Sequence, residues 1–483
     1  MPLAPVASPG LSISGRQKSL LVWISVIAGS VLVLLGPALW NGFPFMFYDS
    51  GVFIELAVQG GFSPERSAFY ASFLSAFRPS FSLWPAMVAQ VLMTVLIMAA
   101  FARALLPNLS AGRFFILIMV LCVGTGLPWY AAEILPDILA PLLVICLYLL
   151  GFHADKLTWA HKVALTAAAV LAATSHASHL GLAAGLAVFV ALMQIATRHM
   201  ALASASPRWR LPVLVFSLSL LALVTSNFVR TGEVFISRSG PAFVLGRLVQ
   251  DGIVKRLLDD TCPESGYRLC AYKDDLPRDA NSYLWGQDSP FWKLGGFEGT
   301  ADEAKSIIVE SLKRYPLLHL KAASRNTLEQ LVTFETGDGI EPLFDVPIPP
   351  MQRQIPEQVE DYRAARQQND QIEFRWINVL QVPVGAASIV ALAAILVAAV
   401  WRRNWSDRFF LPAFLLIALF GNAFICGALS NPQDRYQSRL IWLACFAVLL
   451  LAKRPRAFSA ALEPIIPRRT TPDPRSRKAF QAG

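Results

Sequence analysis

The sequence has little charge for its length. Of its 483 residues, 16% are charged, against about 25% in an average soluble protein, and 55% are hydrophobic. This composition excludes a disordered chain and an ordinary soluble enzyme, and six cysteines are too few for a disulfide-dense secreted module. The net charge of +9 indicates nucleic-acid binding only if the basic residues cluster outside a membrane context.

The sequence also lacks an internal repeat and a glycine-rich nucleotide-binding loop. Many secondary transporters are built from inverted repeats, so the missing repeat argues against that class. Without a glycine-rich loop to hold phosphates, a nucleotide-linked substrate is disfavoured.

Long apolar runs are what the sequence has instead. A helix needs about 20 apolar residues to cross the ~30 Å hydrocarbon core of a bilayer. The stretch 163–196 has a polar centre at 174–179, which predicts a turn between two short helices. We therefore predict an all-α polytopic membrane protein with about ten transmembrane helices; one span over 163–196 would make nine. The other predicted spans are 20–39, 84–101, 114–129, 134–150, 211–228, 376–401, 409–428 and 440–451.

The distribution of Lys and Arg predicts the orientation of these spans. With the N-terminus inside, every inner loop carries basic residues, as the positive-inside rule requires. The short outer loops carry only Arg66, Arg78, Arg435 and Arg439. We expect a multi-pass protein of the plasma membrane with both termini in the cytosol. The excess of Lys and Arg over Asp and Glu then reflects the orientation of the protein in the membrane. No nucleic acid is expected as a partner.

This topology divides the chain into five parts. The large loop is acidic, with 18 Lys and Arg against 23 Asp and Glu, and its apolar residues recur at helical spacing over 241–260 and 302–334. We therefore expect it to be a mainly helical extracytoplasmic domain. The parts are the cytosolic N-terminus 1–19, an N-terminal transmembrane module 20–229 of about seven spans whose first outer loop is 41–83, the loop domain 230–375, a C-terminal transmembrane module 376–452 of about three spans, and a disordered basic cytosolic tail 453–483.

Two cysteines lie in the large loop. Cys262 and Cys270 are predicted to form a disulfide if the loop is extracytoplasmic, with a metal pair as the rival interpretation. The other four cysteines fall in predicted spans and are interpreted as small core residues. Adjacent aspartates at 259–260 and 274–275 are solvated surface groups or, alternatively, metal ligands.

The first outer loop places a carboxylate at the membrane boundary. Asp49 follows the first span, and apolar residues at 53–57 and 69–74 have the spacing of two amphipathic helices on the membrane surface. Asp49 is either the N-cap of the helix that follows it or a catalytic base.

The pattern Tyr-Asp-Ser-Gly, followed by an amphipathic helix and Glu-Arg-Ser-Ala-Phe-Tyr, resembles the first outer loop of the GT-C superfamily of membrane glycosyltransferases. Protein mannosyltransferase-like and aminoarabinose transferase-like enzymes belong to that superfamily. The resemblance implies that Asp49 acts at the acceptor and that Arg66 and Tyr70 belong to a substrate-binding stretch. It also implies a second acidic site at the next outer loop.

Two further outer loops carry candidate residues. Glu133 and Asp137 are four residues apart, which places them on one helical face, near the donor by the resemblance or at a solvated helix start otherwise. Arg435 and Arg439 have the same spacing and, with Tyr436, could bind one phosphate; the alternative is an ion pair with Asp434 or a lipid headgroup.

These features predict a transferase at the outer face of the membrane. It would move a sugar from a polyprenyl-phosphate donor to a lipid, glycan or protein acceptor, among membrane lipids. No cofactor is required by these motifs, although a divalent metal stays open; His176 and His179 could offer two ligands, or simply pack at a polar turn. The alternatives are a transporter or flippase for a lipid-linked glycan and a non-catalytic envelope assembly protein.

Overall fold

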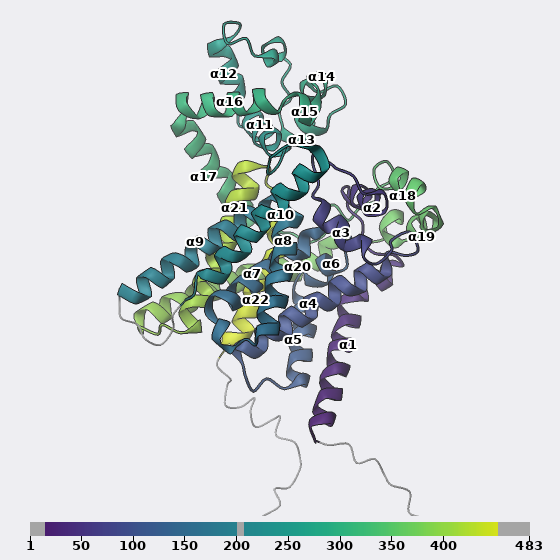
Figure 1. The fold of residues 1–483 in the computed structure, drawn as a ribbon, viewed down its shortest axis with the longest axis vertical. Helices are drawn as coiled ribbons and strands as arrows, with labels where there is room; N and C mark the ends of the chain where they lie inside the picture. Colours follow the sequence, from purple (N-terminus) through teal and green to yellow (C-terminus); the bar gives the residue numbers. More distant parts are fainter. Residues whose placement is uncertain (1–14, 200–206, 453–483) are drawn as a thin grey trace, which may run out of the picture. The chain divides into compact units, whose positions relative to one another are not determined.

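The computed structural model describes residues 15–199 and 207–452, and all of its regular elements in these ranges are helices (Figure 1). The predicted tail 453–483 lies outside the described residues, as do residues 1–14 of the predicted N-terminal segment. Six helices are long and apolar enough to cross a membrane: α1 (Gly15–Asn41), α4 (Trp84–Leu105), α9 (Ala177–His199), α10 (Arg210–Thr231), α20 (Phe374–Trp401) and α21 (Asp407–Leu429). The chain is therefore a helical membrane protein, and the count of ten spans stays a prediction.

The remaining apolar helices are shorter than a span. Helix α7 (Leu139–Phe152) is buried along nearly its whole length, because α4, α8 (Trp159–Ser175), α9 and α10 pack around it. Helix α8 ends at Ser175 and α9 begins at Ala177, and the two helices pack on each other. The polar turn predicted within 174–179 is therefore present. Helix α22 (Asp434–Leu451) is the last helix in the described part of the chain.

Two predicted spans start or end elsewhere because of proline and backbone geometry. The run 114–129 is α5 (Ala111–Gly124) followed by an extended Thr125 and a short α6 (Leu127–Ala131) with Pro128 in its first turn. The run 134–150 starts with a 3-10 turn, Pro136–Ile138, before α7. Proline disfavours the helical conformation for the residue before it, and Leu135 is indeed extended.

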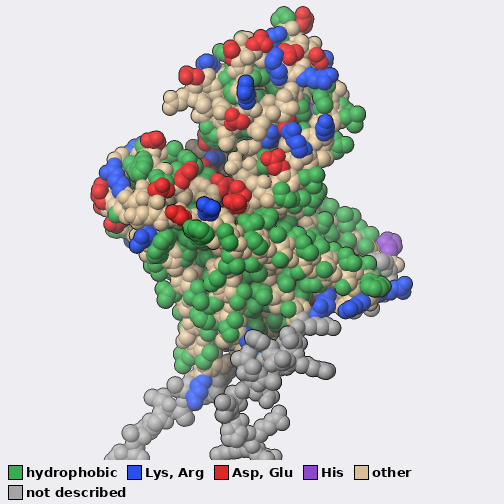
Figure 2. Space-filling view, turned by 180° about the vertical axis from the view of Figure 1, so that it is seen from behind, with side chains coloured by type: hydrophobic (Ala, Val, Ile, Leu, Met, Phe, Trp, Pro, Cys, Tyr) green, Lys and Arg blue, Asp and Glu red, His purple; other side chains and the backbone are tan. Residues whose placement is uncertain are grey.

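The loops that connect these helices lie at two opposite ends of them. At one end, Arg208 donates its backbone N–H to Gly151, His153 pairs with Asp407, and Lys156 reaches the carbonyl of Ala104. All of these residues lie in or beside predicted inner loops. On the face shown in Figure 2, hydrophobic side chains cover the part that holds the long helices, and Asp and Glu side chains gather on the parts away from the inner loops. Which of these two ends lies on which side of the membrane stays a prediction.

Residues 230–375 divide between two packing environments. Helices α11 (Gly240–Gln250), α12 (Ile253–Thr261), α13 (Ala280–Trp285), α14 (Pro290–Lys293), α15 (Gly296–Gly299) and α16 (Ala301–Arg314) enclose one apolar cluster with Leu257, Tyr283 and Phe291 at its centre. We call this unit the cap. The structure joins Cys262 and Cys270 in a disulfide on it, and closing so short a loop stabilises by roughly 2–3 kcal/mol in the chain-entropy treatment.

The two helical stretches predicted in this loop are each broken in two. Gly252 has φ +74°, a left-handed conformation that ends α11 and starts α12. Pro316 ends α16 and begins α17 (Pro316–Val332), because proline supplies no N–H to the preceding turn. Helix α17 leaves the cap and packs along α21 (Figure 1).

The later part of the loop packs on the first outer loop instead. Helix α18 (Ile348–Gln354) lies against α2 (Ser50–Gln59), which also packs on α3 (Ala68–Ser75). Both predicted helices of the first outer loop are therefore present. Helix α19 (Val359–Ala364) follows in the same region.

Amide side chains supply hydrogen-bond partners to backbone groups that lie outside the helices of this region. The side chain of Gln367 accepts from the N–H of Met46 (3.1 Å) and donates to the carbonyl of the same residue (2.7 Å). Asn378 pairs in the same way with both backbone groups of Thr336. A buried backbone group without a partner is costly, so these amides replace the pairing that a helix would supply.

Candidate functional site

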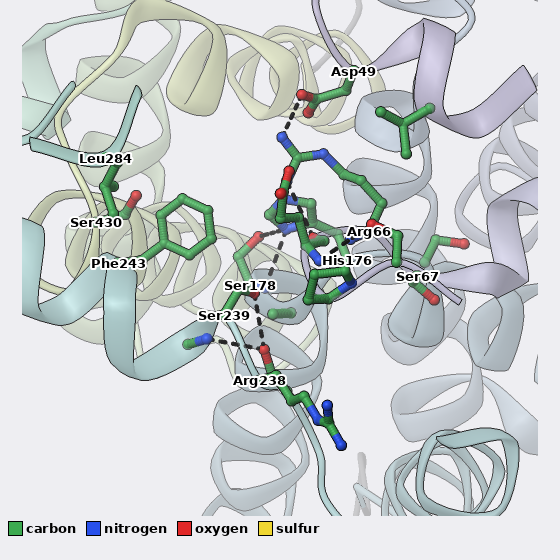
Figure 3. Close-up of a pocket in the computed structure, with 18 of the residues that line it drawn as sticks. Asp49, Arg66, Ser67, His176, Ser178, Arg238, Ser239, Phe243, Leu284 and Ser430 are labelled. Atoms are coloured by element: carbon green, nitrogen blue, oxygen red, sulfur yellow. Dashed lines mark hydrogen bonds and ion pairs between the residues drawn. The ribbon is translucent and has the colours of Figure 1, made fainter. Parts of the chain in front are cut away.

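A cavity of about 950 Å³ lies at the end of the long helices where the predicted outer loops meet. It is bounded by the first outer loop, the α8–α9 turn, the end of α10, the cap and the α21–α22 turn (Figure 3). Among the residues that line it are Asp49, Arg66, Arg435 and Tyr436. The fold thus brings together candidates that are up to 387 positions apart in sequence.

Asp49 and Arg66 form an ion pair on the wall of this cavity (Figure 3). Asp49 occupies the N-cap position of α2, as one interpretation predicted, but its side chain makes no capping hydrogen bond. Ser50 fixes the loop instead: its hydroxyl accepts from the N–H of Phe47 and donates to the carbonyl of Ile134, both at 2.8 Å. The Asp49 carboxylate is therefore free to face the cavity with Arg66.

Arg66 itself is held by the start of α3. The next residue, Ser67, is the N-cap of α3, and its hydroxyl donates to the carbonyl of Thr174 at 2.5 Å. This bond joins the first outer loop to the end of α8. The Arg66 Nη1 donates to the carbonyl of Glu65 at 3.1 Å, and its Nε has no partner among the described residues.

Arg435, which also lines the cavity, has unused hydrogen-bond donors as well. Its guanidinium lies 3.7 Å from the ring centroid of Phe47, and its Nε is 3.6 Å from a carboxylate oxygen of Asp137. Within the described chain, the Nε and Nη1 groups of Arg435 make no hydrogen bond. A buried guanidinium with unsatisfied donors is suited to an anionic ligand.

The second predicted arginine lies behind the cavity wall. Arg439 is fully buried, pairs with Asp137 at 2.7 Å, and donates to Ser178, which lines the cavity, at 3.3 Å. Arg435 and Arg439 thus share a face toward one anion, the carboxylate of Asp137. The alternative of a pair with Asp434 is wrong, because Asp434 accepts from the N–H of Glu335 instead.

Glu133 and Asp137 do not lie on one helical face, contrary to the prediction. Glu133 is bridged to Phe45 in extended backbone before the turn at Pro136, and Asp137 lies within that turn. Both side chains are buried. In the described chain Glu133 makes no ion pair, whereas Asp137 pairs with both arginines.

Tyr70 is a structural residue in this arrangement. Its hydroxyl donates to Gln90 at 2.9 Å, and Gln90 donates to the carbonyls of Ala131 and Glu133. Tyr70 is fully buried and does not line the cavity. It therefore holds the second outer loop against α4.

The two histidines of the α8–α9 turn pack as polar residues. The Nδ1 of His176, which lines the cavity, is 2.8 Å from the Ser178 hydroxyl, and the Nδ1 of His179 is 2.9 Å from the carbonyl of Ala172. In the part of the chain that the structure describes, no three His, Cys, Asp or Glu side chains are placed to share a metal ion.

The structure adds lining residues that the sequence did not single out. Tyr48 donates to Glu341 at 2.5 Å, and this hydrogen bond, with partial burial, raises the pKa of Tyr48 to about 12. Burial also raises the pKa of Glu65, which lines the cavity beside Arg66. Asp338 accepts from the N–H of Arg435 at 3.1 Å. Residues 338 and 341 lie about 290 positions from the first outer loop, so no local pattern indicated them.

The cavity has an apolar side as well as a charged one. Leu180 of α9, Leu223 of α10, and Ile425 and Leu429 of α21 line it where these helices approach their outer ends. Phe243 and Leu284 line it from the cap (Figure 3). A ligand with a charged group and an apolar chain would find complementary walls here.

Comparisons with protein-family models, with curated proteins and with solved structures found no match for this chain.

Proposed function

We propose that the chain is an integral membrane glycosyltransferase of the GT-C type, which moves a sugar from a polyprenyl-phosphate donor to an acceptor on the extracytoplasmic face. The observation that carries the proposal is one cavity in which a carboxylate, Asp49, and a buried guanidinium with unused donors, Arg435, face the same space. Apolar ends of membrane-spanning helices form part of its wall.

In the proposed reaction the acceptor hydroxyl oxygen attacks the anomeric carbon of the sugar. The bond between that carbon and the phosphate oxygen breaks, and polyprenyl phosphate leaves. Asp49 accepts the hydroxyl proton as general base, and Arg66 beside it keeps the carboxylate oriented. The anomeric configuration is inverted because the attack is opposite to the leaving group.

Arg435 would stabilise the phosphate that leaves. Its donors lie in a buried site, where an interaction with developing negative charge is stronger than in water. Asp137 and Arg439 hold Arg435 from behind, so they are assigned as positioning residues. The carrier lipid would lie against Leu180, Leu223 and Ile425.

The membrane topology of the protein is part of the same proposal. Ten spans, a plasma-membrane location and cytosolic termini would place the cavity, the cap and the first outer loop on the extracytoplasmic side. The basic residues gathered at the opposite end of the long helices support this orientation.

The test is donor consumption by the purified protein in liposomes, with a panel of polyprenyl-phosphate sugars. Asp49→Asn keeps the shape of the side chain but removes the base, so turnover should fall about 10²–10⁴-fold. Asp288→Asn, on the exposed surface of the cap, is the matched control and should keep wild-type turnover. Near-normal turnover by Asp49→Asn contradicts the assigned base. Movement of a fluorescent lipid-linked glycan across the bilayer without donor consumption contradicts the transferase and supports the flippase.

A further inference from the structure

The C-terminal half of helix α17 has its polarity reversed relative to a helix on a soluble domain. The fully buried residues of α17 are polar: Asn326, Thr327 and Gln330, whereas Leu318 and Ala322 in its first half pack against the apolar cluster of the cap. Four large aliphatic residues point outward, with exposed fractions of 78% for Leu317, 64% for Leu320, 63% for Leu328 and 74% for Val332. A soluble amphipathic helix shows the opposite arrangement, with an apolar face inward.

The buried polar residues have defined partners in the protein. The side chain of Gln330 donates to the carbonyl of Gln433 at 2.8 Å and accepts from its N–H at 3.0 Å. Asn326 donates to Asp251, the residue after α11, at 3.0 Å. These bonds fix α17 to the irregular backbone between α21 and α22 and to the cap. The inward orientation of its polar face is therefore specified and leaves the aliphatic side chains outward.

The contact between α17 and α21 is close enough to require glycine. A Cβ added to Gly427 would lie 2.5 Å from the carbonyl oxygen of Asn326. Close backbone approach at a small residue is typical of helix pairs within membranes. The C-terminal part of α17 is thus placed beside the outer end of a helix that is long and apolar enough to span the bilayer.

The outward leucines share one face. Leu317, Leu320 and Leu328 are separated by three and eight residues, which brings them back to the same side of a helix. On α21, Phe420 and Phe424 are exposed in the same way. Lys321 lies on the same face of α17, where a long basic side chain can reach lipid phosphates, whereas Arg325 pairs with Asp251 at 2.7 Å.

We propose that the outward face of α17 contacts membrane lipid, with its aliphatic residues against acyl chains and Lys321 among headgroups. Continuity with the exposed apolar face of α21 favours lipid over a protein partner as the occupant. The C-terminal half of α17 then belongs to the membrane part of the protein, while its first half packs on the cap. The proposal does not depend on the glycosyltransferase activity.

The test is the accessibility of spin labels on the full-length protein in nanodiscs. The label is placed at Leu328→Cys and, as a second site, at Val332→Cys, in a Cys122→Ala background because the other free cysteines are buried. Phe420→Cys on α21 is the lipid control, and Lys305→Cys on the exposed surface of α16 is the water control. The readout is the ratio of collision rates with oxygen and with a water-soluble nickel complex.

The ratio at 328 and 332 should shift toward oxygen, as at 420, while the label at 305 favours the nickel complex. Collision with the nickel complex at 328 and 332 as frequent as at 305 would show a water-exposed face and overturn the proposal. An immobilised label that meets neither agent would show that a protein, such as a second copy of the chain, covers the face, and would overturn it equally.

Discussion

Arg439 lies 2.7 Å from Asp137, and both side chains are sealed from solvent. A second guanidinium, that of Arg435, approaches the same carboxylate at 3.6 Å. Two positive groups around one carboxylate leave an excess of donors, and in the described chain the Nε and Nη1 groups of Arg435 make no hydrogen bond. The buried pair therefore sets the position of Arg435, which keeps unused donors for a ligand.

Removing the central carboxylate should destabilise the protein strongly. In Asp137→Asn, both arginines stay buried without a counter-charge, a defect that costs about 3–5 kcal/mol in other proteins. The measurement is thermal unfolding in detergent. Asp259→Asn is the control, since Asp259 pairs with Lys255 on the exposed surface of the cap, and loss of such a solvent-screened pair changes stability little. Equal shifts for the two variants would contradict the structural role of Asp137.

Replacing Arg435 by lysine should separate charge from geometry. Arg435→Lys keeps the positive charge near Asp137 but loses the planar fork that suits phosphate. We expect donor turnover to fall about 10²-fold or more, as for the loss of one transition-state hydrogen bond, with little change in unfolding temperature. Arg353→Lys, at an exposed pair with Glu55, should keep full turnover. A fully active Arg435→Lys would remove Arg435 from the proposed phosphate site.

Helix positions were predictable from the sequence where local chemistry decides them. The polar run at 174–179 indicated the turn between α8 and α9, and apolar spacing indicated α2 and α3. The error at Glu133 and Asp137 was avoidable, because Pro136 between them disfavours a continuous helix. The same signal, Pro316, explains the break between α16 and α17.

The composition of the site was only partly predictable. Local motifs pointed to Asp49, Arg66 and Arg435, but their meeting in one cavity depends on packing between distant segments. Nothing near Asp338 or Glu341 in sequence indicates that they face Arg435 and Tyr48. The inward polar face of α17 was also hidden, since a helix with mixed composition matches a soluble domain until its neighbours are known.

Loss of the buried Gln367 amide should show how much the stability of the first outer loop depends on its contacts with the later part of residues 230–375. Gln367→Leu leaves the N–H and carbonyl of Met46 without their partners, at a cost of about 1–3 kcal/mol for each group. Thermal unfolding should shift accordingly, and protease should cut within 41–83 sooner. Gln352→Leu on the exposed side of α18 is the control and should leave both measurements unchanged. Unchanged protease resistance in Gln367→Leu would show that α2 and α18 hold the loop without this amide.

Glu65 should make stability depend on pH in a known direction. Burial raises its pKa in the folded state, Asp49 adds to the effect, and Arg66 opposes it. The folded state therefore holds its proton at a pH where the unfolded chain has released it, so stability falls as pH rises from the ordinary glutamate pKa through the raised one. The side chain at position 65 of the Glu65→Gln variant cannot titrate. The unfolding temperature of this variant should therefore rise relative to that of the wild type as the pH increases through this range. Glu357→Gln, at an exposed position, should track the wild type throughout. If Glu65→Gln also tracks the wild type at every pH, the carboxylate is solvated in the folded protein and does not stand against the cavity wall.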